Sequence, residues 1–185
     1  MQLLFIILYR ILMYKKILVP VDGSEPSNVA LEHAIKLSQQ CKGGNDSTVN
    51  GNIEITILYV IPELPTSIGL LEGPMRSPKT GELVSYSEYV KEIYEIMKTS
   101  SVKKLINMKN KYESSNVPIQ TKVIAESTGS VVNNILNYAD KEKVDLIVIG
   151  NIGLGGLSKF KALGSVSRSL SEKATCPVLI VHQGN

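Results

Sequence analysis

Short apolar runs alternate with longer amphipathic segments along most of the chain. The runs are rich in Val, Ile and Leu, as expected for strands that are buried on both faces of a parallel sheet. They lie at residues 17–21, 53–61, 117–125, 144–149 and 177–182. Between them, apolar residues recur at helical spacing at residues 26–41, 85–114, 129–142 and 165–174. This alternation predicts an α/β fold in which helices cover both faces of a five-stranded parallel sheet.

Two segments do not follow the alternation. Residues 62–84 contain four prolines and three glycines, which predicts a long irregular loop insertion, either functional or disordered. Because it follows a strand at the edge where ligands bind in such sheets, we expect it to cover the site.

Residues 1–12 contain an apolar run too short for a membrane span, which takes about 20 residues. We interpret residues 1–12 as an extension or start-site artefact and residues 13–185 as the domain; the alternative is an apolar arm that packs on the domain or on a partner.

Composition narrows the classes of partner. The net charge is +3, and the chain has no Trp and only two Phe, which argues against a nucleic acid as partner. The N-terminal run lacks the basic start and the cleavage site of a signal peptide, so we expect neither membrane attachment nor export. Cys41 and Cys176 are too few for a disulfide framework and are expected to be free thiols in the reducing cytoplasm.

The most informative segment is the glycine-rich stretch after the fourth predicted strand. Four glycines fall within residues 150–156, and Gly164 and Ser165 stand at the start of the next predicted helix. Glycines let backbone N–H groups approach a ligand, and a helix N-terminus offers unpaired donors. Residues 146–171 contain no acid but include Lys159, Lys161 and Arg168. The stretch therefore predicts a phosphate site; a solvated basic loop is the alternative. It matches neither the Walker loop nor the dinucleotide fingerprint.

With these motifs in view, the chain resembles the universal stress protein family, in its ATP-binding branch, from Met13 to the end. The opening KILVPVDGS at residues 16–24 and the closing CPVLIVH at residues 176–182 are similar to the family's first and last strands. The family motif G-x2-G-x9-G-[ST] is matched by Gly150, Gly153 and the pair Gly164 and Ser165, with a spacer of ten residues before the last glycine.

The resemblance implies a strand order of 3-2-1-4-5 and a nucleotide site where that order reverses. In this comparison, Asp22 binds the ribose hydroxyls and the backbone of Val60 binds adenine. The remaining residues assigned to nucleotide binding line the phosphates, the ribose and the crevice: Pro20, Val21, Ile149, Gly150, Gly153, Gly164, Ser165 and Val166. Taken alone, Asp22 would be read as a turn residue that bonds its own backbone.

Together, these features predict an ATP-binding universal stress protein that acts as a nucleotide-dependent regulatory module in the stress response. The alternative is a slow ATPase or an ATP-using transferase, with ATP bound with or without Mg²⁺. We assign no catalytic residue. A phospho-acceptor receiver domain is disfavoured, because the first strand ends in Asp22 without a cluster of acids. The apolar last strand, residues 177–182, would lie at a sheet edge, so we expect it to join a homodimer.

Overall fold

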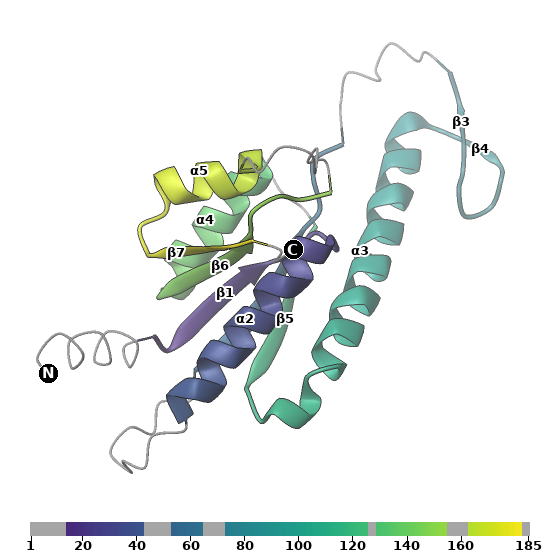
Figure 1. Ribbon diagram of the computed structural model, residues 1–185. Coiled ribbons are helices and arrows are strands. Elements are labelled where there is room, and N and C mark those ends of the chain that lie inside the picture. Colours follow the sequence, from purple (N-terminus) through teal and green to yellow (C-terminus); the bar gives the residue numbers. More distant parts are fainter. Residues whose placement is uncertain (1–13, 43–52, 65–72, 126–128, 155–162, 183–185) are drawn as a thin grey trace, which may run out of the picture.

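A parallel sheet of five strands forms the centre of the protein (Figure 1). The computed structural model describes residues 14–42, 53–64, 73–125, 129–154 and 163–182. The strands are β1 (Lys16–Pro20), β2 (Glu54–Val60), β5 (Ile119–Ile124), β6 (Leu146–Gly150) and β7 (Val178–Val181). Their order is β5-β2-β1-β6-β7, and every neighbouring pair is parallel. The predicted fold class and the order 3-2-1-4-5 are therefore confirmed.

Four described helices cover the two faces of the sheet, as the alternation predicted (Figure 1). Two of them, α2 (Glu25–Lys42) and α3 (Tyr86–Asn110), lie on one face, and α4 (Val131–Glu142) and α5 (Ser165–Lys173) lie on the other. The starts of α3 and α4 are capped by serine hydroxyls: Ser85 accepts from the Glu88 N–H, and Ser130 accepts from the Asn133 N–H. No helix in these described ranges is long and apolar enough to cross a membrane.

The core is divided between the two faces by the strands themselves. Successive side chains of a strand point to opposite faces: in β1, Ile17 and Val19 pack under α2, whereas Leu18 packs under α4 and α5. All three are essentially inaccessible to solvent. The sheet is thus buried on both sides, which explains why its strands are continuous apolar runs and not alternating ones.

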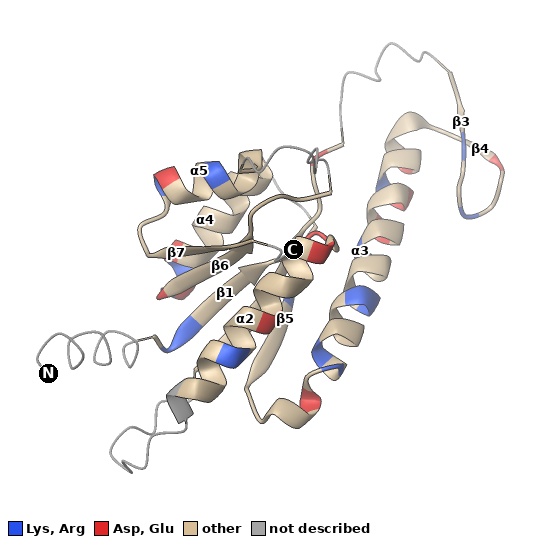
Figure 2. Cartoon of the chain, viewed as in Figure 1, with Lys and Arg blue, Asp and Glu red and all other residues tan. Residues whose placement is uncertain are grey.

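Helix α3 is the longest helix among the described residues, but it is shorter than the sequence suggested. The predicted span of 85–114 ends in the structure at Asn110, and a 3-10 turn follows at Glu113–Ser115. Figure 2 shows acidic residues towards the start of α3 and basic residues towards its end, including Glu88 in the first turn and Lys109 in the last. This arrangement complements the dipole of the helix.

The insertion contains a small hairpin, which corrects the prediction of a wholly irregular segment. Strands β3 (Met75–Arg76) and β4 (Leu83–Val84) pair in antiparallel fashion beside α3. The Ser77 hydroxyl, which is buried, donates a hydrogen bond of 2.6 Å to Glu92 of α3. Strands of two residues are too short to show alternation, so the sequence pattern could not reveal them. Residues 1–13 and 65–72 lie outside the described residues, and the expectations for them stay predictions.

Candidate functional site

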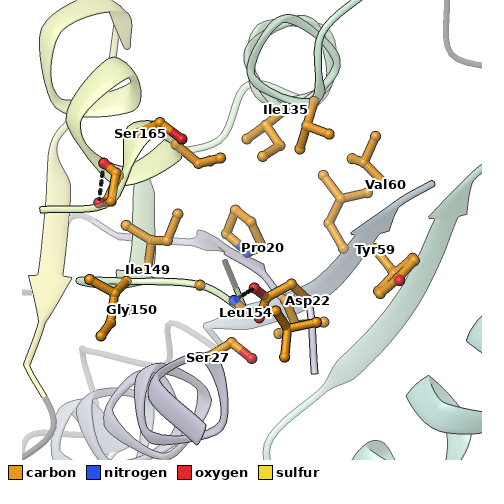
Figure 3. A pocket seen from close by; sticks show the side chains of 18 of the residues that line it. Pro20, Asp22, Ser27, Tyr59, Val60, Ile135, Ile149, Gly150, Leu154 and Ser165 are labelled. Atoms are coloured by element: carbon orange, nitrogen blue, oxygen red, sulfur yellow. Dashed lines mark hydrogen bonds between the residues drawn. The ribbon is translucent and has the colours of Figure 1, made fainter. Parts of the chain in front are cut away.

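The carboxyl ends of β1, β2 and β6 meet at one edge of the sheet and border a cavity of about 430 Å³ (Figure 3). The strand order reverses between β1 and β6, so their connections leave towards opposite faces and open a crevice. All ten residues assigned to nucleotide binding from the sequence line this cavity: Pro20, Val21, Asp22, Val60, Ile149, Gly150, Gly153, Gly164, Ser165 and Val166. The structure therefore brings the predicted set together, while the role of each residue stays a prediction.

One side of the cavity is apolar. Figure 3 shows Val60 of β2 and Ile135 of α4 across the cavity from Ser165 and Ile149. The sequence interpretation did not assign several residues of this side, which are Leu58, Tyr59, Pro62, Val131 and Ile135. Helical spacing relates Val131 to Ile135, and strand alternation relates Leu58 to Val60. Those periodicities are the signal that could have found them.

The insertion reaches the cavity only at its start. Among the described residues of 62–84, Pro62 alone lines the cavity. Nearby, the Leu64 N–H donates to the Tyr94 hydroxyl of α3 at 2.9 Å. The hairpin packs on α3 (Figure 1), and none of the hairpin's residues is among those that line the cavity. The part of the insertion that could cover the site falls at residues 65–72, outside the described residues.

Asp22 is held between two segments far apart in sequence. Its Oδ1 accepts from the Ser24 N–H at 2.9 Å, and its Oδ2 accepts from the Leu154 N–H at 2.8 Å. Partial burial would raise the pKa of this carboxyl, but hydrogen bonds from Ser24, Leu154 and Ser27 outweigh it and leave the pKa below its ordinary value of 3.8. Asp22 is therefore an anion at neutral pH. Asp22 forms the local turn and also lines the cavity, while its role towards a ligand stays a prediction.

Gly150 is required by packing between a helix and a strand. A Cβ on Gly150 would lie 2.7 Å from the backbone carbonyl carbon and oxygen of Pro26, in the first turn of α2. Such a distance is far inside van der Waals contact, and backbone cannot rotate away as a flexible side chain can. The bare backbone of Gly150 thus lets the start of α2 close over the end of β6, beside the cavity.

The N-terminus of α5 supplies hydrogen-bond donors to the other side of the cavity. Gly164 is its N-cap residue, no side chain caps this helix, and its first turn contains no acid. The Gly164 N–H donates to the Asn151 carbonyl at 2.7 Å, and the buried Ser167 hydroxyl donates to the same oxygen at 2.8 Å. The N–H groups of the first turn of a helix have no partner within that helix. They and the helix dipole fit an anionic group.

Other titratable groups add little to this site. Cys176 is a free, partly buried thiol, and burial raises its pKa. The described part of the chain holds no cluster of three or more His, Cys, Asp or Glu placed to bind a metal ion. Lys159 and Lys161, which the sequence placed near the phosphates, lie outside the described residues. Asp22 is the one carboxylate among the described residues that line the cavity.

Comparison with known proteins agrees with this fold. Residues 13–182 match the Universal stress protein family. The chain is 33% identical to Universal stress protein YxiE of Bacillus subtilis, covering 91% of this chain and 99% of that protein. The solved structure of MJ0577 of Methanocaldococcus jannaschii is 26% identical, with a TM-score of 0.68 over 94% of this chain and 99% of that one. A family protein of Arabidopsis thaliana, solved with AMP bound, shares the fold, with 18% identity and a TM-score of 0.56 over 92% of each chain.

Proposed function

The chain belongs to the universal stress protein family, and we propose that it binds ATP in the cavity beside Asp22. In this proposal the protein is a nucleotide-dependent regulatory module of the stress response in the cytoplasm, and it works as a homodimer. The observation that carries the proposal is the division of one cavity into an apolar side and a donor-rich side, with a carboxylate between them.

The cavity has the size and lining of a small-molecule site. Its volume of about 430 Å³ falls within the range of about 300–1,000 Å³ for such sites, which are mostly apolar with a few placed polar groups. The side lined by Val60 and Ile135 would receive the adenine ring. The N-terminus of α5 would receive the phosphates, because unpaired N–H groups and the helix dipole favour negative charge. Asp22 would accept hydrogen bonds from the ribose.

The direction of the backbone groups of Val60 supports a role for this residue in recognising the base. The Val21 N–H donates to the Leu58 carbonyl at 2.8 Å, one residue after β1 ends. Alternate residues of a strand turn their backbone groups to the same neighbour, so Val60 presents its backbone groups on the same side as Leu58. The Val60 carbonyl therefore faces a position beyond the end of β1, where an adenine amino group could donate to it.

A binding role is better supported than a catalytic one. The lowered pKa of Asp22 makes it a weak base, and both of its oxygens already accept hydrogen bonds from the backbone. Such a group is suited to holding a ligand. If Mg²⁺ takes part, it would arrive with the phosphates. The Arabidopsis protein that was solved with AMP bound lends support to an adenine nucleotide as the ligand.

The direct test is the nucleotide content of the protein purified without added ligand, followed by calorimetry with ATP, ADP, AMP and GTP. We expect adenine nucleotide to be released on denaturation, and ATP to bind more tightly than GTP. A Val131→Trp variant should abolish binding, because the indole would fill the apolar side of the cavity. Asn133→Trp is the matched control, since Asn133 is an exposed residue of the same helix that does not line the cavity.

Two outcomes would contradict the proposal. One is the absence of adenine nucleotide in the purified protein together with no heat of binding for any adenine nucleotide. The other is equal ATP affinity in the Val131→Trp and Asn133→Trp variants. Release of inorganic phosphate from ATP at a rate that depends on Asp22 would instead favour the ATPase alternative.

A further inference from the structure

Gly153 lies directly against the carboxylate of Asp22. A Cβ built on Gly153 would be 2.4 Å from Oδ2 of Asp22, and among the described residues no other atom outside the adjoining residues and the Asp22 carboxylate lies within 4 Å of that position. The backbone dihedrals of Gly153 fall outside the left-handed region, so a larger residue is not excluded by the backbone itself. Within the part of the chain that the structure describes, Asp22 is what restricts this position.

This close approach makes a specific hydrogen bond possible. The next residue after Gly153, Leu154, donates its N–H to the same Oδ2 at 2.8 Å, while the Ser24 N–H binds Oδ1 at 2.9 Å. The carboxylate is therefore fixed at both oxygens, between the end of β1 and the loop that follows β6. A carboxylate has about four lone-pair positions, so these two backbone N–H groups do not exhaust its capacity, which the nearby hydroxyls of Ser24 and Ser27 share.

We propose that Gly153 is a positioning residue for ribose recognition: by lacking a side chain, it lets Leu154 orient the Asp22 carboxylate towards the two hydroxyls of the ribose. This inference rests on the proposed function, in which Asp22 faces the ribose. It assigns the second glycine of the loop to the sugar, whereas the sequence pattern suggested that this glycine gives room to phosphate.

The two roles for Gly153 predict different behaviour in a double-mutant cycle. If the glycine serves Asp22, an added methyl group does harm only while the carboxylate is present. Gly153→Ala should weaken ATP binding about tenfold or more, the effect of disturbing a hydrogen bond to a charged group. In an Asp22→Ala background, the same substitution should change ATP affinity by less than about twofold, because the group it displaces is gone. If the glycine serves phosphate, the loss should be equal in both backgrounds.

The preference for ATP over its deoxyribose analogues provides a second test, because a purely structural role of Gly153 would leave that preference unchanged. The unmutated protein should bind 2′-deoxy-ATP and 3′-deoxy-ATP about tenfold more weakly than ATP, because each lacks one donor to Asp22. Gly153→Ala should bind all three nucleotides with nearly equal affinity. Calorimetry on the full chain gives these values directly. Retention of the full preference for ATP in Gly153→Ala would overturn the inference.

A third measurement needs no nucleotide and separates this inference from the proposed function. Carbon-detected NMR titration follows the pKa of Asp22 in the free protein. The Leu154 N–H is one of the groups that lower this pKa, so Gly153→Ala should raise it towards its ordinary value. Gly73→Ala is the control, because a Cβ there meets no atom of the described residues within 4 Å. An unchanged Asp22 pKa in Gly153→Ala would contradict the positioning role even if ATP binds.

The measurements therefore distinguish a failure of this inference from a failure of the proposed function. If the unmutated protein binds no adenine nucleotide, the proposed function fails, and the NMR result alone decides whether Gly153 orients Asp22. If ATP binds and the cycle is additive, the proposed function stands and the inference is wrong.

Discussion

At the scale of single residues, the glycines near the cavity meet three different constraints. Gly150 is pressed against the backbone of Pro26, Gly153 against the carboxylate of Asp22, and Gly164 forms the N-cap of α5. A glycine-rich motif read from sequence suggests a single purpose, namely backbone that approaches a phosphate. The contacts show that only Gly164 stands at the helix N-terminus itself, while the other two allow protein groups to approach each other.

The contact with Pro26 makes Gly150 important for the stability of the fold. A Gly150→Ala variant should lose about 1–3 kcal/mol in its free energy of unfolding, since the added methyl group must displace backbone in the first turn of α2. Urea denaturation measures this loss. Gly73→Ala, where a Cβ meets no described atom within 4 Å, should unfold like the parent protein. Equal stability of the two variants would show that α2 yields to the methyl group without cost.

At the scale of elements, the sequence predicted best those segments whose ends are marked by particular residues. The start of α2 is marked by Ser24, whose hydroxyl accepts from the Ser27 N–H at 3.3 Å. The start of α4 is marked in the same way by Ser130, whereas α5 starts after Gly164, where no side chain caps the helix. The ten residues assigned through the resemblance to the family lie near these ends or the strand ends and line the cavity, while their roles stay predictions.

The rest could not be predicted because it depends on contacts between elements. The hairpin β3–β4 has strands of two residues, and its position relies on α3. The apolar side of the cavity needs α4 to lie over the end of β2, which brings Ile135 near Val60. The contact of Gly153 with Asp22 joins residues more than a hundred positions apart. No local pattern carries information of these kinds.

The hairpin offers a test at this scale. The Ser77 hydroxyl oxygen accepts from the N–H groups of Lys79 and Thr80 and donates to Glu92. In Ser77→Ala, both N–H groups lose their acceptor and the hydrogen bond to Glu92 of α3 is lost, while the ion pair between Lys79 and Glu95 remains. The amides of Ser77 and Gly81, which are bonded within the hairpin, should exchange with solvent about tenfold faster. Hydrogen-exchange NMR measures this rate.

The global free energy of unfolding should change little in Ser77→Ala, because the hairpin lies outside the two clusters of the core. Leu83→Ala is the control, since the Leu83 side chain is 65% exposed and contributes little packing to lose. If exchange at the Ser77 and Gly81 amides is as slow in Ser77→Ala as in the control, the hairpin does not depend on the hydrogen bonds of the Ser77 hydroxyl.

At the scale of the whole molecule, the strand order decides both where the cavity lies and which strands stand at the edges of the sheet. The reversal between β1 and β6 creates the cavity, and the same order places β7 at an edge of the sheet. Within β7, the carbonyls of Pro177 and Val181 accept from β6, which implies that alternate residues face the neighbouring strand. The backbone groups of Val178 and Ile180 therefore point to the open side. An apolar edge of this kind is normally covered or paired.

We expect β7 to pair with its own copy about a two-fold axis, which gives a closed homodimer. Proline variants test this from both sides of the strand. Ile180→Pro removes an N–H on the open side of β7 and should give a folded monomer, with Ile180→Ala as the control for lost packing. Leu179→Pro removes an N–H that faces β6 and should destabilise the fold. Light scattering at micromolar concentration should report twice the chain mass of 20.2 kDa for the parent protein and for Ile180→Ala. A single chain mass for the parent protein, both at full length and starting from Met13, would reject the dimer, and a dimer that persists in Ile180→Pro would move the interface away from β7.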